Sequence, residues 1–428
     1  MKTPEEFLKD HGFTLADDID RQALVAAFMD EMKKGLEGKP SSLMMIPTFV
    51  SVTGKVPQGA KAVVLDAGGT NFRGGIVSIP PQIEEKRNQP MPGTKSEVGE
   101  EEFYGAFAEE VKRLRPSANV SKIGWCFSYP AEATRSLDAK LVRWTKNIKA
   151  PSIVGQSVGA ELLKRLGGGE IAIVNDTVAT LLAAKATEGD KTYSSYIGFI
   201  LGTGTNAAYV ESNANIKKLS DLDPEGSMII NAESGGFSKF PQSDFDKALD
   251  SKSGNVGFQL LEKMISGAYL GDIGLEIYKA AAKEGLFSKK VGDAIRGIGH
   301  LETMDFDNFC ASFKKEGREN VLDAIFADPD SAKMARRLGI PVFERAATLT
   351  AIHLAAFVIQ TGKGDDPESP VAINADGSTY YKTRAIPFAG VVARELDEML
   401  VRRRNIHYAI TPQVDDAPMV GAAIAAMI

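Results

Sequence analysis

Apolar and polar residues alternate along this chain with periods that predict both helices and strands. Leu24, Phe28, Met32 and Leu36 recur every four residues, which predicts an opening helix from about residue 20 to 34. Short continuous apolar runs predict buried strands. The predicted strands cover residues 61–66, a strand ending in 75–79, and residues 122–127, 171–175, 196–201, 206–211, 371–374 and 406–410. Further helices are predicted around 103–114, over 158–166, from 181 onward, through most of 258–360 and over 419–428. Strands mixed with helices in this way predict α/β layers with covered sheets.

Composition narrows the class of protein. The chain has 428 residues, 43% apolar and 25% charged, as in an ordinary globular protein. At about 150 residues per domain this length allows three domains, and two larger lobes fit as well. The net charge of −6 argues against a nucleic-acid-binding protein with a basic surface. The dense basic run Arg402–Arg404 is interpreted as a solvated helix face.

The cysteines and the apolar stretches predict a cytoplasmic protein. Cys126 and Cys310 are far apart and form no metal-ligand spacing, which favours a reducing compartment. The four histidines are scattered and form no metal-binding motif. The N-terminal residues contain no apolar signal core. The most apolar stretches, 346–360 and 417–428, are shorter than the ~20 residues of a membrane span, so we expect buried helices.

Two glycine-rich turns follow buried strands and are candidates for phosphate binding. They are Gly68-Gly69-Thr70-Asn71 and Gly202-Thr203-Gly204-Thr205-Asn206. Glycine lets backbone N–H groups approach a phosphate closely, and hydroxyl side chains stand beside the glycines. Either turn alone is better explained as a plain β-hairpin, but two such turns, both rich in Thr and Asn, favour phosphate binding. Asp66 ends the strand before the first turn, where a carboxylate can hold the hydration shell of Mg²⁺.

Other phosphate-binding motifs fit less well. Gly202-x-Gly204-x-x-Ala207 matches the dinucleotide fingerprint, but a strand is predicted where that motif requires a helix. No GxxxxGK[ST] sequence is present. We therefore expect the two glycine-rich hairpins together to bind the phosphates.

Asp176 is the candidate general base. It follows a predicted strand, and the carboxyl ends of strands in α/β sheets border the ligand crevice. Phosphoryl transfer to an alcohol requires a carboxylate that accepts the hydroxyl proton. The alternative is that Asp176 caps the following helix, and both roles are compatible. Lys146 after Trp144 and Thr145 can neutralise charge on the transferred group or simply be exposed.

A sugar presents vicinal hydroxyls that carboxylates, amides and hydroxyls match at fixed geometry. The candidate sugar contacts are Ser128, Asn175, Asn206, Glu233 and Glu262. Each of them taken singly is also typical of a surface or capping residue.

Taken in order, these residues resemble the hexokinase family. Leu65-Asp-Ala-Gly-Gly-Thr-Asn-Phe-Arg73 is similar to its first phosphate motif, and Phe127-Ser-Tyr-Pro130 and Trp144-Thr-Lys146 to its sugar motifs. The other matching segments are Val174-Asn-Asp-Thr-Val178, Gly202-Thr-Gly-Thr-Asn-Ala207, Asn231-Ala-Glu233, Glu262–Gly271 and Asp376-Gly-Ser378. The similarity is strongest over residues 60–280.

The resemblance implies a two-lobed actin-like ATPase fold of the ribonuclease H type, with duplicated mixed five-stranded sheets around a central cleft. It implies a small lobe of residues 56–174 plus about 412–428, and a large lobe of residues 1–55 plus 175–411. The cleft is expected to close on sugar, which expels water and suppresses ATP hydrolysis.

The resemblance also assigns roles to residues. Asp176 becomes the base, Lys146 a pocket and phosphate contact, and ATP with Mg²⁺ the phosphoryl donor. The sugar contacts become Ser128, Thr145, Lys146, Asn175, Asp176, Asn206, Glu233 and Glu262. Mg-ATP is assigned to Asp66, Gly68, Gly69, Thr70, Asn71, Arg73, Gly202, Thr203, Gly204, Thr205, Gly377 and Ser378. Asp66 and Asp176 are expected to reach ATP-bound Mg²⁺ through water, with no dedicated protein metal site.

Three positions depart from the family pattern. The Gly/Ser-rich nucleotide turn near the C-terminus reads Asp415-Asp-Ala-Pro-Met-Val-Gly421, which bears on nucleotide choice. Ser234 replaces a bulky residue after Glu233, and Ala268 stands where some members carry a larger one.

The expected reaction is ATP-dependent phosphorylation of a hexose, glucose first, at its 6-hydroxyl. The partners are the hexose and Mg-ATP, with no nucleic acid or membrane, in a monomer or a homodimer. The alternatives are a non-catalytic sugar sensor on the same fold and an actin-like ATPase. The preferred hexose is set by pocket geometry, which the sequence does not contain.

Overall fold

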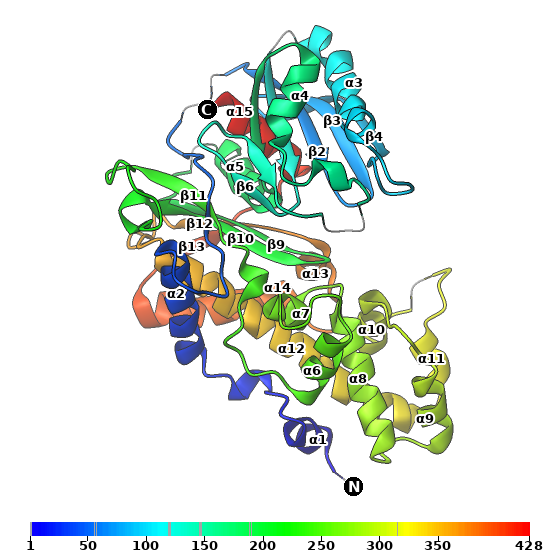
Figure 1. Ribbon diagram of the computed structural model, residues 1–428. Coiled ribbons are helices and arrows are strands. Elements are labelled where there is room, and N and C mark those ends of the chain that lie inside the picture. The colour runs from blue at the N-terminus through cyan, green and yellow to red at the C-terminus, as the bar shows by residue number, and fades with distance from the viewer. Residues whose placement is uncertain are drawn as a thin grey trace.

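Two mixed sheets with the same strand order form the centre of the molecule (Figure 1). The structure is a computed structural model that describes residues 2–54, 56, 58–118, 121–144, 148–187, 189, 191–314 and 316–428. Its strands are β1 (Ile46–Pro47), β2 (Lys61–Ala67), β3 (Asn71–Ser78), β4 (Gln82–Pro90), β5 (Lys122–Phe127), β6 (Ala131–Ala133), β7 (Ala139–Leu141), β8 (Glu170–Val174), β9 (Ser195–Leu201), β10 (Thr205–Ser212), β11 (Ser227–Asn231), β12 (Val371–Asp376) and β13 (Tyr408–Ile410).

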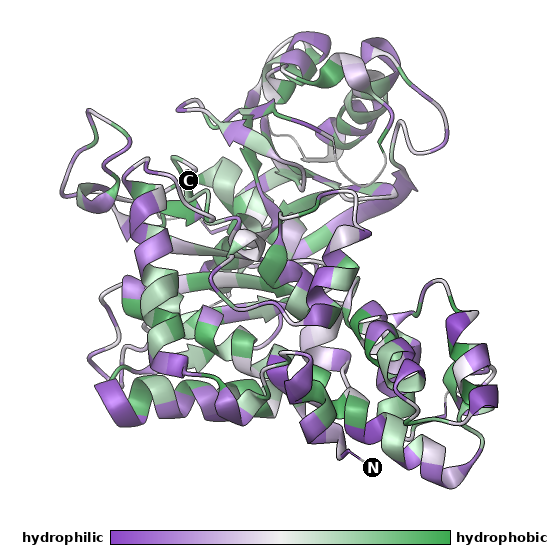
Figure 2. Ribbon diagram, turned by 60° about the horizontal axis from the view of Figure 1, so that its bottom comes forward, coloured by the Kyte–Doolittle hydropathy of each residue, from purple (hydrophilic) through white to green (hydrophobic). Residues whose placement is uncertain are grey.

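Helices cover these sheets and lie between them. They are α1 (Pro4–Asp10), α2 (Arg21–Leu36), α3 (Glu100–Ala118), α4 (Val158–Leu166), α5 (Asp176–Ala186), α6 (Asp244–Ser251), α7 (Leu260–Ile265), α8 (Leu270–Lys283), α9 (Lys289–Arg296), α10 (Thr303–Cys310), α11 (Val321–Ile325), α12 (Pro329–Gln360), α13 (Ser378–Lys382), α14 (Phe388–Leu396) and α15 (Ala417–Met427). In Figure 2 the outer helices carry both hydrophobic and hydrophilic residues along their length, as expected when one face is buried.

The strand order shows that the two sheets are repeats of one unit. The first sheet has the order β4-β3-β2-β5-β8, and the second has β11-β10-β9-β12-β13 with β1 added at the β11 edge. In each, three strands form an antiparallel meander and two further strands run parallel to the first of the three. The expected α/β fold with duplicated sheets is confirmed. The second sheet has six strands rather than five, because residues 46–47 pair with β11.

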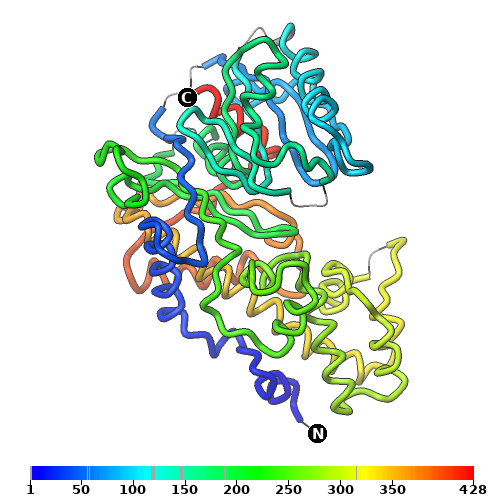
Figure 3. Tube along the Cα trace, in the orientation of Figure 1, coloured from blue at the N-terminus to red at the C-terminus, as the bar shows by residue number. Residues whose placement is uncertain are grey.

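The last helix of each repeat packs on the sheet of the other repeat. Helix α5 follows β8 of the first sheet and packs on β9, β10 and β12, whereas α15 follows β13 and packs on β5, β2 and β8. In Figure 3 the C-terminal segment accordingly lies among the strands of the N-terminal sheet. The apolar cluster between the sheets contains Val178 and Leu182 of α5 together with Ala422 and Ala423 of α15.

Glycines allow the backbones in this central layer to approach closely. A Cβ on Gly421 of α15 would lie 1.8 Å from the carbonyl oxygen of Ala179 in α5. A Cβ on Gly124 of β5 would lie 2.1 Å from the carbonyl oxygen of Ala422, and Gly198 of β9 has a similar contact with Thr177. Because a backbone carbonyl cannot swing aside as a side chain can, these positions fix how the helices cross between the sheets.

The outer face of the second sheet is covered by α12, which is longer than the apolar stretch predicted at 346–360. This helix has 32 residues and is long and apolar enough to cross a membrane by length and composition. Its most apolar window is 89% buried inside the protein, so it is a core helix here, as expected for that stretch. Phe199 of β9 and Tyr209 of β10 pack against His353 and Phe357 of α12.

His353 is a buried imidazole that the fold keeps neutral. It is fully buried among Phe28, Phe199 and Phe357, and neither ring nitrogen has a hydrogen-bond partner among the described residues. Burial lowers the pKa of His353 to about 3. An unfolded chain binds this proton near pH 6.5, so between pH 6.5 and 3 the unfolded state holds more protons and stability falls as the pH falls.

Replacing His353 with leucine should therefore stabilise the protein and flatten its pH dependence below pH 6.5. The variant no longer buries two ring nitrogens without hydrogen-bond partners, and this should raise the free energy of unfolding by about 1–3 kcal/mol. The loss of stability on acidification should shrink by up to about 1.4 kcal/mol per pH unit. Urea titrations at several pH values measure both effects.

The matched control is His300→Leu, which should leave the slope below pH 6.5 unchanged and alter the pH dependence of stability only above that pH. Hydrogen bonding to Asp272 raises the pKa of His300, so this group adds stability below its unfolded pKa and loses that contribution as the pH rises. An unchanged acid slope in His353→Leu would contradict the assignment of a neutral buried imidazole.

Candidate active site

The two predicted glycine turns are hairpin turns at corresponding places in the two repeats. Residues 68–70 join β2 to β3, and residues 202–204 join β9 to β10. The N–H of Gly68 donates to the carbonyl of Asn71 at 3.1 Å, and that of Gly202 to the carbonyl of Gly204 at 2.9 Å. Both turns are therefore β-hairpin turns, and this geometry is compatible with the predicted binding of phosphate.

Close packing around the second turn requires its glycines. A Cβ on Gly204 would lie 2.6 Å from Oε2 of Glu262, and a Cβ on Gly267 would lie 2.9 Å from the carbonyl oxygen of Gly202. Gly377 has φ +112°, and a Cβ there would lie 2.3 Å from the carbonyl oxygen of Leu201. The predicted adenosine-side loop at Gly377 and Ser378 therefore lies directly beside the second turn.

Asp66 and Arg73 stand opposite each other next to the turn of the β2–β3 hairpin. They are Cα partners in the antiparallel pair, and Nε of Arg73 donates to Oδ2 of Asp66 at 2.9 Å. Nη1 of Arg73 donates to Oδ1 of Asp416 at 2.6 Å, and Nζ of Lys86 donates to Oδ2 of Asp416 at 2.7 Å. The guanidinium thus links the first hairpin to the residue before α15, in the loop that departs from the family pattern. The phosphate and magnesium roles of Arg73 and Asp66 stay predictions.

Asp176 is the first residue of α5, immediately after Asn175. Asn175 is the N-cap, and its Oδ1 accepts from the N–H of Thr177 at 2.9 Å and from the hydroxyl of Thr177 at 2.6 Å. The same N–H also lies 2.9 Å from Oδ1 of Asp176. The capping expected of Asp176 is therefore carried mainly by Asn175. Asp176 thus stands at the positive end of the helix dipole of α5.

A chain of amide hydrogen bonds connects Asn175 to the second hairpin. Nδ2 of Asn206 donates to Oδ1 of Asn231 at 2.8 Å, and it lies 3.5 Å from Oδ1 of Asn175. Nδ2 of Asn231 in turn donates to Oε1 of Glu233 at 2.9 Å. The N–H of Ser234 donates to Oδ1 of Asn206 at 3.0 Å, so this buried serine fixes the amide orientation of Asn206.

The two predicted sugar-binding glutamates join this group from different elements. Glu233 follows β11 in a left-handed conformation with φ 52°. Burial raises the pKa of Glu233, and the nearby charge of Asp176 raises it further, against a hydrogen bond from Asn231 that lowers it. Oε2 of Glu262 in α7 accepts from the N–H of Thr205 at 3.0 Å.

Ser128 lies beside a buried thiol that stands between two carboxylates. Cys126 of β5 is the strand neighbour of Asp66, and Oγ of Ser128 lies 3.8 Å from its Sγ. Burial raises the pKa of Cys126, and the charges of Asp66 and Asp176 add to this effect. In the sheet, β5 lies between β2 and β8, so Ser128 follows a strand that is flanked by the strands leading to the first turn and to Asp176.

The structure thus brings together most of the predicted site residues. Around the second hairpin it gathers Asn175, Asp176, Asn206, Glu233, Glu262 and Gly377, and Ser128 follows the strand that pairs with β2 of the first hairpin. Thr145 and Lys146 lie outside the described residues.

Some neighbours of the site were missing from the predicted list. Asn231 stood in a quoted motif, so its position at a strand end could have identified it. Asp416 bonds to Arg73, and Lys86 bonds to Asp416, across more than 300 residues of chain. Asp416 stood in the quoted C-terminal turn, but no local pattern identifies its partners.

Cavity size does not locate this site. A cavity of about 30 Å³ lies beside the amide chain, lined by Asn175, Asn231 and Thr48 among others. A cavity of about 470 Å³ is lined by none of the predicted site residues, although Asp416 in its wall bonds to Arg73. The volume between two lobes depends on how they are arranged, so the chemistry of the residues identifies the site better than the volume does.

Two repeated sheets, a glycine turn on each, and a carboxylate at a helix start make up the core of this candidate site. Sequence profiles described as hexokinase match residues 11–186 and 196–428. The chain belongs to the hexokinase family.

Individual relatives agree with this family. Hexokinase-1 of Nicotiana tabacum is 34% identical over 411 residues, covering 85% of this chain and 79% of that protein. Hexokinase-2 of Homo sapiens is 32% identical over 387 residues, covering 83% of this chain and 41% of the human protein. This chain thus spans less than half of the length of the human relative.

Solved structures agree with the fold. The hexokinase of Schistosoma mansoni, solved in complex with glucose, aligns over 100% of both chains with a TM-score of 0.77 and 26% identity. The ROK hexokinase of Thermus thermophilus aligns over 86% of this chain with a TM-score of 0.51 and 16% identity, which is a likeness of fold alone.

Proposed function

We propose that this chain transfers the γ-phosphoryl group of ATP to the 6-hydroxyl of a hexose, with glucose as the first substrate. The observation that carries the proposal is that the carboxylate of Asp176 and both glycine turns belong to one connected site. Asn206, two residues after Gly204, reaches Asn175 and Thr177 at the start of α5. Cys126 of β5 pairs with Asp66, before the first turn, on one side and with Val174, two residues before Asp176, on the other.

Each part of the site has a chemical task in this reaction. The backbone N–H groups of the two turns hold the phosphates of Mg-ATP, and Asp66 and Asp176 reach the Mg²⁺ ion through water. Asn175, Asn206, Glu233 and Glu262 match the sugar hydroxyls, with Ser128, Thr145 and Lys146 as further contacts. Asp176 accepts the proton of the 6-hydroxyl as its oxygen attacks the γ-phosphorus in line.

Closure of the cleft fits the observed architecture. The small lobe of residues 56–174 plus about 412–428 and the large lobe of residues 1–55 plus 175–411 each contain one turn. Movement of one lobe against the other around α5 and α15 would exclude water from the transferred group. We also place the protein in the reducing cytoplasm, a proposal supported by the two buried free cysteines Cys126 and Cys310.

A coupled assay for ADP tests the proposed function. With Mg-ATP present, ADP release should depend on added glucose, and a panel of mannose, fructose and glucosamine should rank the hexoses. ADP release at the same rate without any sugar would instead indicate an actin-like ATPase. Sugar binding without ADP release would indicate a sensor.

Acid should weaken sugar binding because of Glu233. A protonated carboxyl offers a poorer acceptor to a sugar hydroxyl, and the pKa of Glu233 is raised above its usual value by burial and by Asp176. KM for the hexose should therefore rise as the pH falls toward and through this raised pKa, before KM for ATP changes. Initial rates over a pH series measure both constants.

The glutamine variant provides the comparison for this effect. Glu233→Gln should show a higher hexose KM that no longer depends on pH in the same range, because the amide does not titrate. If the variant kept the acid rise of the native protein, another group would be responsible for it.

A further inference from the structure

A larger cavity lies between the two repeats, and Asp416 in its wall bonds to Arg73 of the first hairpin. It has a volume of about 470 Å³, within the range of roughly 300–1,000 Å³ that is usual for small-molecule sites. Its walls come from Ile83 of β4 in the first sheet, Thr187 after α5, and Val414 between β13 and α15. None of the residues assigned to the hexose or to Mg-ATP lines it.

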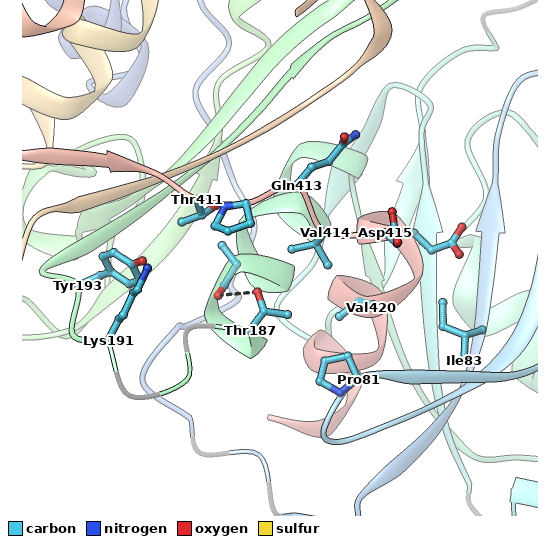
Figure 4. A pocket seen from close by; sticks show the side chains of 13 residues that line it. Pro81, Ile83, Thr187, Lys191, Tyr193, Thr411, Gln413, Val414, Asp415 and Val420 are labelled. Carbon is cyan, nitrogen blue, oxygen red and sulfur yellow. Dashed lines mark hydrogen bonds between the residues drawn. The ribbon is translucent and has the colours of Figure 1, made fainter. Parts of the chain in front are cut away.

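Opposite charges stand at different sides of this cavity. Figure 4 shows Lys191 and Tyr193 on one side and Asp415 on the other, with Val414 and Val420 between them. Lys191 and Tyr193 belong to the segment between α5 and β9, and Asp415 belongs to the segment before α15. The cavity therefore offers a cationic end, an apolar middle and an anionic end.

Asp415 is the acidic residue with capacity for a ligand here. Its neighbour Asp416 also lines the cavity, but that carboxylate is bonded by Arg73 and Lys86. Within the described residues Asp415 makes no hydrogen bond or ion pair, and its side chain is exposed. A cation bound at Asp415 would meet a carboxylate that is not already neutralised.

We propose that this cavity is a binding site for a small zwitterion with an apolar body, such as an ω-amino acid. Its ammonium group pairs with Asp415. Its carboxylate pairs with Lys191 and accepts a hydrogen bond from the hydroxyl of Tyr193. Its methylene chain lies against Val414 and Ile83. Because the walls come from both repeats, the bound molecule favours the relative placement of the repeats that forms this cavity.

Ligand-observed NMR titration of the full chain with 6-aminohexanoate tests the proposal. Hexylamine and hexanoate are the matched probes, since each has the same chain and one of the two charges. Exposed ion pairs are weak, so 6-aminohexanoate should bind about 1.4- to 5-fold more tightly than either probe at low salt. Equal affinities for the three probes, or no binding of 6-aminohexanoate, would overturn the proposal.

Variants assign the two ends of the ligand. Asp415→Asn should reduce the affinity for 6-aminohexanoate to that for hexanoate, and Lys191→Met should reduce it to that for hexylamine. Thr187→Trp, at an exposed wall position, should block binding by filling the cavity, and Asp330→Asn at a distant helix start is the control that should leave binding unchanged. Binding that survives Thr187→Trp at native affinity would place the ligand elsewhere and refute the site.

Competition separates this site from the substrate sites. The affinity for 6-aminohexanoate should stay measurable when a non-hydrolysable ATP analogue and glucose are present at saturation. Complete displacement by the nucleotide would mean that the cavity is part of the nucleotide site, and it would contradict the proposal. Because binding is read directly, the outcome does not depend on whether the chain phosphorylates a hexose.

Discussion

Replacing Asp176 with asparagine should lower kcat for hexose phosphorylation by about 10²–10⁴-fold, the usual cost of losing a general base. The asparagine keeps the size of the side chain and its place at the start of α5, but it cannot accept the proton of the sugar hydroxyl. Asn175 caps the helix through Thr177, so the fold around the site should persist. The coupled ADP assay gives kcat, and sugar binding is measured separately by calorimetry.

The informative result is a separation of binding from turnover. KM or the dissociation constant for the sugar should change far less than kcat, because the other sugar contacts are intact. The control Asp330→Asn makes the same chemical change in the first turn of α12, and it should leave kcat unaltered. A rate near that of the native protein in Asp176→Asn would show that another group accepts the proton.

Removal of Arg345 should cost the protein about 3–5 kcal/mol of stability, because it leaves a buried carboxylate without its partner. Arg345 in α12 and Asp246 in α6 have side chains that are 0% and 2% exposed, and two hydrogen bonds of 2.8 Å join them. The guanidinium also lies 4.1 Å from the ring centroid of Phe13. Burial alone would raise the pKa of Asp246, but the charge and hydrogen bonds of Arg345 hold it below the usual value.

Urea unfolding of Arg345→Met measures this loss. The double variant Arg345→Met with Asp246→Leu should recover part of it, because no unpaired charge then remains buried. The exposed pair of Lys289 and Asp293 is the control, and Lys289→Met should cost less than about 1 kcal/mol. If the single and double variants at the buried pair lost the same stability, packing rather than the charge would explain the cost.

The hydrophobic pattern identified the buried elements well. The strands predicted at 61–66, 122–127, 171–175 and 196–201 correspond to β2, β5, β8 and β9, all of them inner or parallel strands with apolar runs. Strand β4 was missed, because Gln82–Pro90 is mostly polar and exposed and becomes a strand by pairing with β3 at the sheet edge. Strand β11 (Ser227–Asn231) was missed as well.

The candidate site residues could be predicted from the sequence where they lie at the ends of strands. Glycine turns after apolar runs and the polar pair Asn175-Asp176 are local features, because a strand must end where its apolar run ends. The amide chain through Asn206, Asn231 and Glu233 has local members, but their hydrogen bonds join β10 to β11 and α5. The sequence could name these residues, and only the folded chain could connect them.

What the sequence alone determined is therefore the inventory: two glycine hairpins, a carboxylate at a helix start, and apolar segments of the right length for two covered sheets. Tertiary structure decided which of these meet. The exchange of α5 and α15 between the sheets, the contact of Gly421 with Ala179, and the link from Arg73 to Asp416 join residues hundreds of positions apart. Local periodicity reports which residues are buried. The choice of partners depends on close packing and on pairing of buried charges across the whole chain, and these energies exist only once the chain has folded.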